Sequence, residues 1–201
     1  MIIMQNVCFF NTVKFWGGGE KLHLEYALKF MEINYRVYLV TCKDSPLHRK
    51  GKETGLLNFN IYAGNLSFLN PLKYFRLIRF YRQEKIDTVI FSSSQDLKLG
   101  ALSAKIAGVK SIVYLRGLAA PVKNSFLNRV LFQHVLTHIV ANSEATKRTI
   151  LQNLGKSVDA DKVKVIYHGI DLDVIDHKSR SALLTPGLSP ALAVQIWTYG
   201  R

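Results

Sequence analysis

The sequence is poor in the features that mark membrane-spanning and secreted proteins. Its 201 residues include only two cysteines, Cys8 and Cys42, and no uninterrupted apolar run of about 18 residues. The sequence therefore predicts no membrane-spanning helix, and the two thiols are most simply core residues in a reducing cytoplasm. Met1 to Phe10 lacks the basic start of a signal peptide, so we expect a strand there. These observations favour a cytoplasmic protein.

Acidic residues are also scarce. The chain has 14 Asp and Glu against 27 Lys and Arg, which gives a net charge of +13. Such a charge implies an anionic partner: a membrane surface, a nucleic acid or a phosphorylated substrate. No recognised nucleic-acid-binding motif occurs in the sequence, so we do not expect nucleic acid to be the partner.

Short apolar runs alternate with helical patterns along the chain. The alternation predicts an α/β fold, a Rossmann-like parallel sheet of about seven strands with helices on both faces. The expected strands are rich in β-branched and aromatic residues, as in sheets buried on both sides; they span 2–10, 36–42, 58–63, 88–92, 111–115, 138–141 and 163–167. The expected helices span about 19–33, 45–53, 70–84, 95–107, 125–136 and 143–154.

The pattern changes near the end of the chain. Residues 176–190 are rich in Ser, Pro and Gly, which is typical of a linker, and another strand-like run follows at 191–199. We therefore expect an α/β domain over residues 1–175, an interdomain linker over 176–190, and the first strand of a truncated second domain over 191–201.

Three consecutive glycines, Gly17, Gly18 and Gly19, stand between the first expected strand and the first expected helix. This position is the carboxyl end of a sheet strand, where open α/β folds bind ligands, and the helix start presents unpaired N–H groups to an anion. The spacing fits neither the dinucleotide fingerprint nor a P-loop. A flexible loop with a glycine-assisted turn is the alternative. Glu20 is expected to offset the helix dipole rather than to bind a ligand.

The expected helix at 70–85 carries basic and apolar residues on the same side. A helical projection puts Tyr74, Leu77, Ile78 and Tyr81 against the sheet. The opposite side holds Lys73, Phe75, Arg76, Arg79, Phe80 and Arg82, together with Leu72. Such a face is typical of a helix lying on an anionic membrane surface. A solvated basic face with its aromatic residues covered by loops is an equal alternative.

Four short motifs resemble those of one enzyme family in their order and spacing. They are Gly17-Gly18-Gly19-Glu20 with the helix and strand up to Thr41, the run 139–147 (IVANSEATK), the run 163–171 (VKVIYHGID) and the run 197–201 (WTYGR). Together they resemble the amino-terminal half of the GT-B glycosyltransferases, in the retaining, nucleotide-sugar-dependent group that includes glycosyltransferase family 4.

The resemblance implies a function for the parent protein. It would transfer a sugar from a nucleotide-sugar to a glycan or lipid-linked acceptor, in cell-surface polysaccharide or lipopolysaccharide synthesis. The nucleotide-sugar is a substrate, and no cofactor or metal is expected. Most donor contacts would come from the missing carboxyl-terminal domain, so the chain alone would be inactive. It would work in the cytoplasm or at the inner face of the membrane. The alternative is a non-catalytic membrane-docking subunit that partners a separate catalytic chain.

The resemblance also suggests site residues, two of them at departures from the family pattern. Gly17, Gly18 and Gly19 would face the donor phosphates. Arg116, the candidate catalytic residue, stands near the place of a His in many members; its fork could bind a phosphate or acidic sugar, or bind carbonyls at the strand end. His168 replaces the usual Asn and would lie at a hinge or in the cleft. Ser93 and Gln95 are candidates for acceptor contacts, with helix capping by Ser94 as the alternative.

Overall fold

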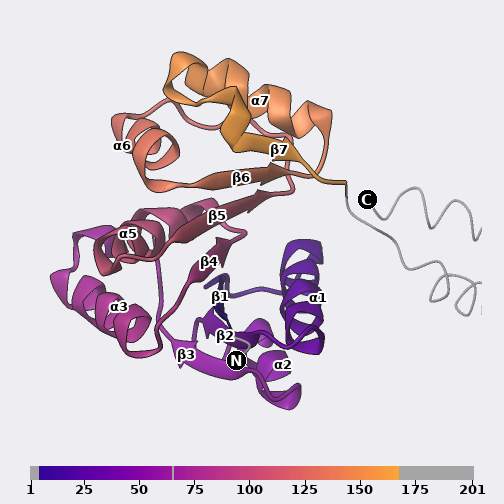
Figure 1. The fold of residues 1–201 in the computed structure, drawn as a ribbon, viewed down its shortest axis with the longest axis vertical. Helices are drawn as coiled ribbons and strands as arrows, with labels where there is room; N and C mark the ends of the chain where they lie inside the picture. The colour runs from indigo at the N-terminus through magenta and orange to yellow at the C-terminus, as the bar shows by residue number, and fades with distance from the viewer. Residues whose placement is uncertain (1–4, 65, 168–201) are drawn as a thin grey trace, which may run out of the picture. The chain divides into compact units, whose positions relative to one another are not determined.

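A seven-stranded sheet forms the centre of the computed structural model, which describes residues 5–64 and 66–167 (Figure 1). Its strand order is β3-β2-β1-β4-β5-β6-β7, and each neighbouring pair is parallel. The strands are β1 (Asn6–Phe10), β2 (Arg36–Thr41), β3 (Leu57–Asn60), β4 (Thr88–Phe91), β5 (Ser111–Arg116), β6 (His138–Ala141) and β7 (Val163–Val165). The predicted Rossmann-like fold is confirmed.

Helices connect the strands at the predicted places. They are α1 (Gly18–Glu32), α2 (Pro46–Glu53), α3 (Pro71–Gln83), α4 (Ser94–Asp96), α5 (Leu102–Ala107), α6 (Phe126–Val130) and α7 (Glu144–Leu154). Two segments are π-helical, η2 (Leu97–Ala101) and η3 (Leu131–Val135), and three are 3-10 turns, η1 (Ser67–Leu69), η4 (Gly155–Ser157) and η5 (Ala160–Lys162). The expected helices at 95–107 and 125–136 thus each contain a π-helical segment.

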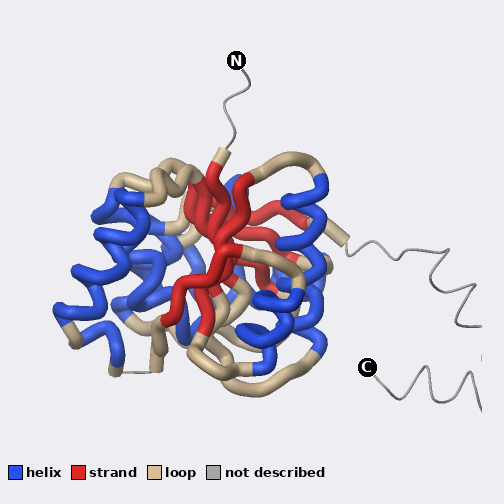
Figure 2. Tube along the Cα trace, turned by 90° about the horizontal axis from the view of Figure 1, so that it is seen from below, coloured by secondary structure: helices blue, strands red, loops and turns tan. Residues whose placement is uncertain are grey.

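The sheet separates two apolar clusters. Helices α1 and α2 cover one face, where Phe9 and Leu39 pack against Leu24 and Leu47. Helices α3, α5, α6 and α7, with η2 and η3, bury the other cluster, which includes Phe10 and Phe91. Figure 2 shows helices on both sides of the strands. Because both faces are covered, the strands are apolar on both sides, as the near-continuous apolar runs predicted.

The strand order reverses beside β1. The chain proceeds from β1 through β2 to β3 at one edge, and α3 then returns it to β4, on the other side of β1. In the β1–β4 register Phe10 lies opposite Phe91, so the loops that follow these two residues start side by side. Open α/β sheets bind ligands outside the carboxyl ends of the strands at such a switch point.

Helix α3 differs from its predicted orientation. Phe80 is only 7% exposed and stacks on Phe59 of β3, with ring centroids 4.3 Å apart. The expectation that Phe80 belongs to a membrane-facing surface is therefore wrong, because its ring packs in the core against Tyr38 of β2 and Phe59 of β3. Phe75, Arg76, Arg79 and Arg82 are exposed as predicted.

Several expectations fall on residues that the structure does not describe. His168, the linker at 176–190 and the strand at 191–201 lie outside the described ranges. Across residues 5–64 and 66–167, no helix is long and apolar enough to cross a membrane.

Candidate functional site

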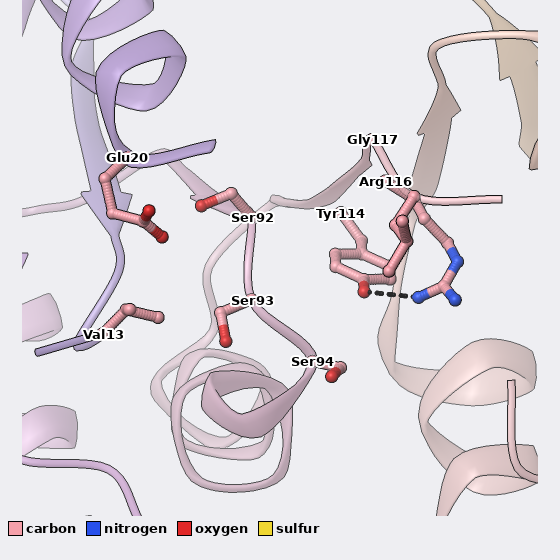
Figure 3. Close-up of a pocket in the computed structure, with 9 residues that line it drawn as sticks. Val13, Glu20, Ser92, Ser93, Ser94, Tyr114, Arg116 and Gly117 are labelled. Atoms are coloured by element: carbon pink, nitrogen blue, oxygen red, sulfur yellow. Dashed lines mark hydrogen bonds between the residues drawn. The ribbon is translucent and has the colours of Figure 1, made fainter. Parts of the chain in front are cut away.

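A pocket of about 210 Å³ opens at the switch point of the sheet. Its lining residues follow or end three neighbouring strands and include the first turn of α1: Val13, Glu20, Ser92, Ser93, Ser94, Tyr114, Arg116, Gly117 and Leu118. In Figure 3, Val13 and Glu20 stand on one side, Tyr114 and Arg116 on the other, and the three serines along the loop between them. The pocket is thus built from segments about 100 residues apart in the chain.

Asn11 joins the two sides of the switch point. Its buried side chain donates hydrogen bonds from Nδ2 to Oε1 of Glu20 (3.3 Å) and to Oγ of Ser92 (3.0 Å). Its Oδ1 accepts a hydrogen bond from the backbone N–H of Val13 (2.9 Å). One amide therefore holds the loop after β1, the start of α1 and the loop after β4 together.

Glu20 has a larger part in the site than expected. It is 7% exposed, lines the pocket and accepts the hydrogen bond from Asn11. Its position in the first turn of α1 fits the predicted role beside the helix dipole. Its place in the pocket wall adds a carboxylate that can accept hydrogen bonds from hydroxyl groups of a ligand.

The glycine stretch adjoins this pocket without lining it. Gly17 is the N-cap of α1, in an extended conformation, and no side chain caps the helix. A Cβ at Gly17 would meet Oε2 of Glu20 at 3.1 Å, whereas nothing lies within 4 Å of a Cβ at Gly18 or Gly19. The chain's own packing therefore leaves room for larger side chains at the last two positions.

Arg116 ends β5 and is held by two hydrogen bonds. Its Nη1 donates to the Tyr114 hydroxyl (3.0 Å), and its Nη2 donates to the Ala120 carbonyl (2.6 Å). The contact with Ala120 agrees with the second role expected for Arg116, which was to bind carbonyls at the end of the strand. Its Nε is buried without a hydrogen-bond partner among the described residues. The guanidinium thus contributes a fixed positive charge to the pocket wall, which suits an anionic group of a ligand.

The loop after β4 contributes three serine hydroxyls. Ser93 is the N-cap of the helical segment that begins at Ser94, but its side chain makes no capping hydrogen bond. Capping by Ser94, the structural alternative for this loop, is therefore wrong, because Ser94 is already the first helical residue. Gln95 is half-buried and is not among the residues that line the pocket.

Behind the pocket, Asp96 is a buried carboxylate with no solvent exposure. It accepts hydrogen bonds from the backbone N–H (3.0 Å) and the hydroxyl (2.5 Å) of Thr12. Burial raises the pKa of Asp96 from 3.8 to about 7; the Thr12 hydrogen bonds oppose the rise, and the charge of Glu20 adds to it. Asp96 thus fixes the loop that leads from β1 to the glycine stretch.

Sequence reasoning missed Tyr114 and Asp96 as parts of this region, and it did not place Glu20 in the wall of the pocket. Tyr114 and Arg116 are two residues apart on one strand and so share a face, which was a usable signal. Asp96 stands directly before the apolar run that starts at Leu97, and a carboxylate on the apolar side of a helix is a second signal. Within the described residues no group of three His, Cys, Asp or Glu side chains could hold a metal ion.

Comparison with known proteins places this geometry in context. Residues 16–174 match the family described as Glycosyltransferase Family 4. No curated protein matches the chain in a sequence search. The matched range begins beside the glycine stretch and contains every pocket residue except Val13.

Solved structures of low identity share the fold. A glycosyltransferase from Rickettsia africae aligns over 96% of this chain and 48% of its own, at 16% identity and a TM-score of 0.70. HepE of Anabaena, solved with UDP and glucose, aligns over 85% of this chain and 46% of its own, at 20% identity and a TM-score of 0.66. The lipopolysaccharide outer core galactosyltransferase WaaB aligns over 84% and 46%, at 15% identity and a TM-score of 0.63. The chain thus spans about half the length of each of these proteins.

Proposed function

This chain belongs to glycosyltransferase family 4, and from that premise we propose that it forms the acceptor-side domain of a sugar-transferring enzyme. The enzyme takes a nucleotide-sugar as donor and a glycan or lipid-linked molecule as acceptor. The observation that carries the proposal is the position of the pocket. It opens at the switch point of the sheet, beside the uncapped amino end of α1, inside the range that matches the family.

The amino end of α1 suits the leaving group of such a transfer. Cleavage of the bond between sugar and nucleotide leaves negative charge on a diphosphate. Unpaired N–H groups at a helix start, with the positive end of its dipole, stabilise that charge. Gly18 and Gly19 leave room for a phosphate to approach the backbone closely. HepE, which shares the fold, binds UDP and glucose.

The pocket itself suits the acceptor. Glu20 and the hydroxyls of Ser92 and Ser93 can hydrogen-bond to sugar hydroxyl groups. Arg116 can pair with an acidic sugar or a phosphate of the acceptor. The description of WaaB as a lipopolysaccharide galactosyltransferase supports an acceptor of the cell-surface polysaccharide or lipopolysaccharide class.

The proposal includes a second domain that completes the site. The pocket volume of about 210 Å³ is below the roughly 300–1,000 Å³ of a typical ligand site. The proteins with the same fold are about twice as long as this chain. We propose that a donor-binding domain closes over the pocket, and that residues 1–201 alone transfer no sugar.

Release of nucleoside diphosphate tests the proposal. Residues 1–201 and a longer form with the donor-binding domain are each incubated with a panel of nucleotide-sugars and a lipid-linked glycan extract. We expect release that depends on the acceptor from the longer form only. Transfer by residues 1–201 alone would refute the proposal that a second domain is needed to complete the site. If the longer form transfers no sugar from any donor, the proposed glycosyltransferase activity is refuted. Transfer only after addition of a separate catalytic chain would favour the docking subunit.

A further inference from the structure

Four large apolar side chains are exposed to solvent between β3 and the first turns of α3. Leu66, Leu69, Leu72 and Phe75, here called the apolar tip, are 73%, 67%, 72% and 64% exposed. They recur every third residue from just before η1 to the first turns of α3, on either side of the extended residue Asn70. A row of such exposed side chains marks an interaction site more often than isolated ones do.

The backbone beneath the apolar tip is fixed by hydrogen bonds. Asn70 caps α3, its Oδ1 accepting from the N–H groups of Leu72 (3.0 Å) and Lys73 (3.3 Å). The Lys73 ammonium donates to the Tyr62 carbonyl (2.8 Å) and to Oγ of Ser67 (2.8 Å). Lys73 therefore holds the loop in place, and the apolar tip lies on an ordered backbone.

Positive charge lies directly behind the apolar tip. Arg76 and Arg79 continue its exposed side along α3, and the sequence from 54 to 83 contains no Asp or Glu. At about 1.5 Å of rise per residue, Arg79 lies about 10 Å along the helix from Leu72. Interfacial helices bury their apolar side chains about 5–10 Å into the boundary between headgroups and acyl chains. Arginines at this distance reach the level of lipid phosphates.

We propose that the apolar tip inserts into an anionic membrane surface, with Arg76 and Arg79 on its phosphates. The amino-terminal end of α3 enters the lipid, which differs from a helix lying flat on its face, because Phe80 is buried against Phe59. A second protein copy or a nucleic acid fits less well, since exposed apolar side chains are followed along α3 by arginines, Arg76 and Arg79, without acidic residues.

Insertion of the tip would orient the pocket. The segment 61–70 follows β3, and all seven strands are parallel, so the apolar tip and the pocket lie on the same edge of the sheet. Docking therefore turns the pocket edge toward the lipid headgroups. This part rests on the proposed function, because it brings the pocket near a lipid-linked acceptor.

Vesicle sedimentation tests the docking. The chain is mixed with vesicles of phosphatidylcholine alone or of equal parts phosphatidylcholine and phosphatidylglycerol, at low and high salt. We expect salt-sensitive binding to the anionic vesicles only. The double variant Leu72→Ser/Phe75→Ser should lose about tenfold or more in binding. Its control is Met31→Ser/Ile33→Ser, which changes exposed apolar residues at the far end of α1 and should bind normally.

The charge contribution is tested separately. Arg79→Gln should weaken binding to anionic vesicles about fivefold, whereas Lys105→Gln, at an exposed position of α5, should leave it unchanged. Equal losses in tip variants and controls would refute the proposal, as would absence of vesicle binding. A dimer in solution that the tip variants dissociate, without vesicle binding, would assign the tip to a second copy instead. The assay needs no donor or acceptor, so its failure leaves the proposal of sugar transfer untouched.

Discussion

Replacement of Asp96 by Asn tests the buried carboxylate behind the pocket. Burial raises the pKa of Asp96 to about 7, so the folded chain keeps a proton that the unfolded chain releases above its ordinary value of 3.8. The stability from this proton is fully present below pH 3.8 and is lost as the pH rises through about 7. Between about pH 5 and 7 the loss is about 1.4 kcal/mol per pH unit, or about 3 kcal/mol in all.

His23 acts in the opposite direction and must be separated from Asp96. Its ring is buried edge-on to Phe9, and burial lowers its pKa from 6.5 to about 3. Its contribution to stability is therefore present above pH 6.5 and declines as the pH falls toward 3. The two trends oppose each other in the wild type below pH 6.5. Only the difference between wild type and D96N isolates the carboxylate.

Urea unfolding followed by circular dichroism measures that difference. The free energy of unfolding of D96N, relative to the wild type, should rise by about 3 kcal/mol between about pH 5 and pH 8. The variant also loses one acceptor for Thr12, so its absolute stability is less informative than its pH dependence. D161N, at an exposed position, is the control. Wild-type and D96N curves that run parallel across this range would refute the raised pKa of Asp96.

Four further substitutions test the glycine stretch, the pocket wall and the packing of α3. An added Cβ at Gly18 or Gly19 meets open space, and neither glycine has a positive φ. Gly18→Ala and Gly19→Ala should therefore each raise the free energy of unfolding by about 0.4–1 kcal/mol and weaken sugar transfer by the longer form. Unchanged transfer would contradict a role at the donor phosphates. Arg116→Gln should lower the free energy of unfolding by about 1–3 kcal/mol, because Tyr114 and Ala120 lose their hydrogen-bond donor. The control Tyr114→Phe removes the hydrogen bond to Arg116 but keeps the guanidinium. If sugar transfer falls only in proportion to the loss of stability in both variants, Arg116 has no direct part in binding. Phe80→Ala should cost about 3–5 kcal/mol in urea unfolding, against about 0.5 kcal/mol or less for Phe75→Ala; similar costs would contradict the stacking on Phe59.

The sheet could be predicted because its signals are local. Each strand is a short apolar run between helical patterns, and His138–Ala141 was predicted to the residue. The orientation of α3 was harder, because Phe80 lies at the border of the buried side in a helical projection. Its contact with Phe59 depends on the pairing of β3 with β2, which no local pattern contains.

The candidate site was predictable in position but not in composition. The glycine stretch and Ser93 mark the carboxyl ends of β1 and β4, and Arg116 marks that of β5. The hydrogen bonds of Asn11 to Glu20 and Ser92 could not be foreseen, since they depend on how closely two loops approach. A resemblance between sequences does not contain such distances.

The place of β1 between β2 and β4 has a consequence for biosynthesis. Asn11 and its partner Ser92 are 81 residues apart, so a growing chain cannot close this contact until β4 has left the ribosome. At about 5–20 residues per second, translation of that interval takes roughly 4–16 s. During this time one edge of β1 is an unpaired, apolar strand. The growing chain therefore exposes an aggregation-prone edge throughout this interval, before any pocket exists.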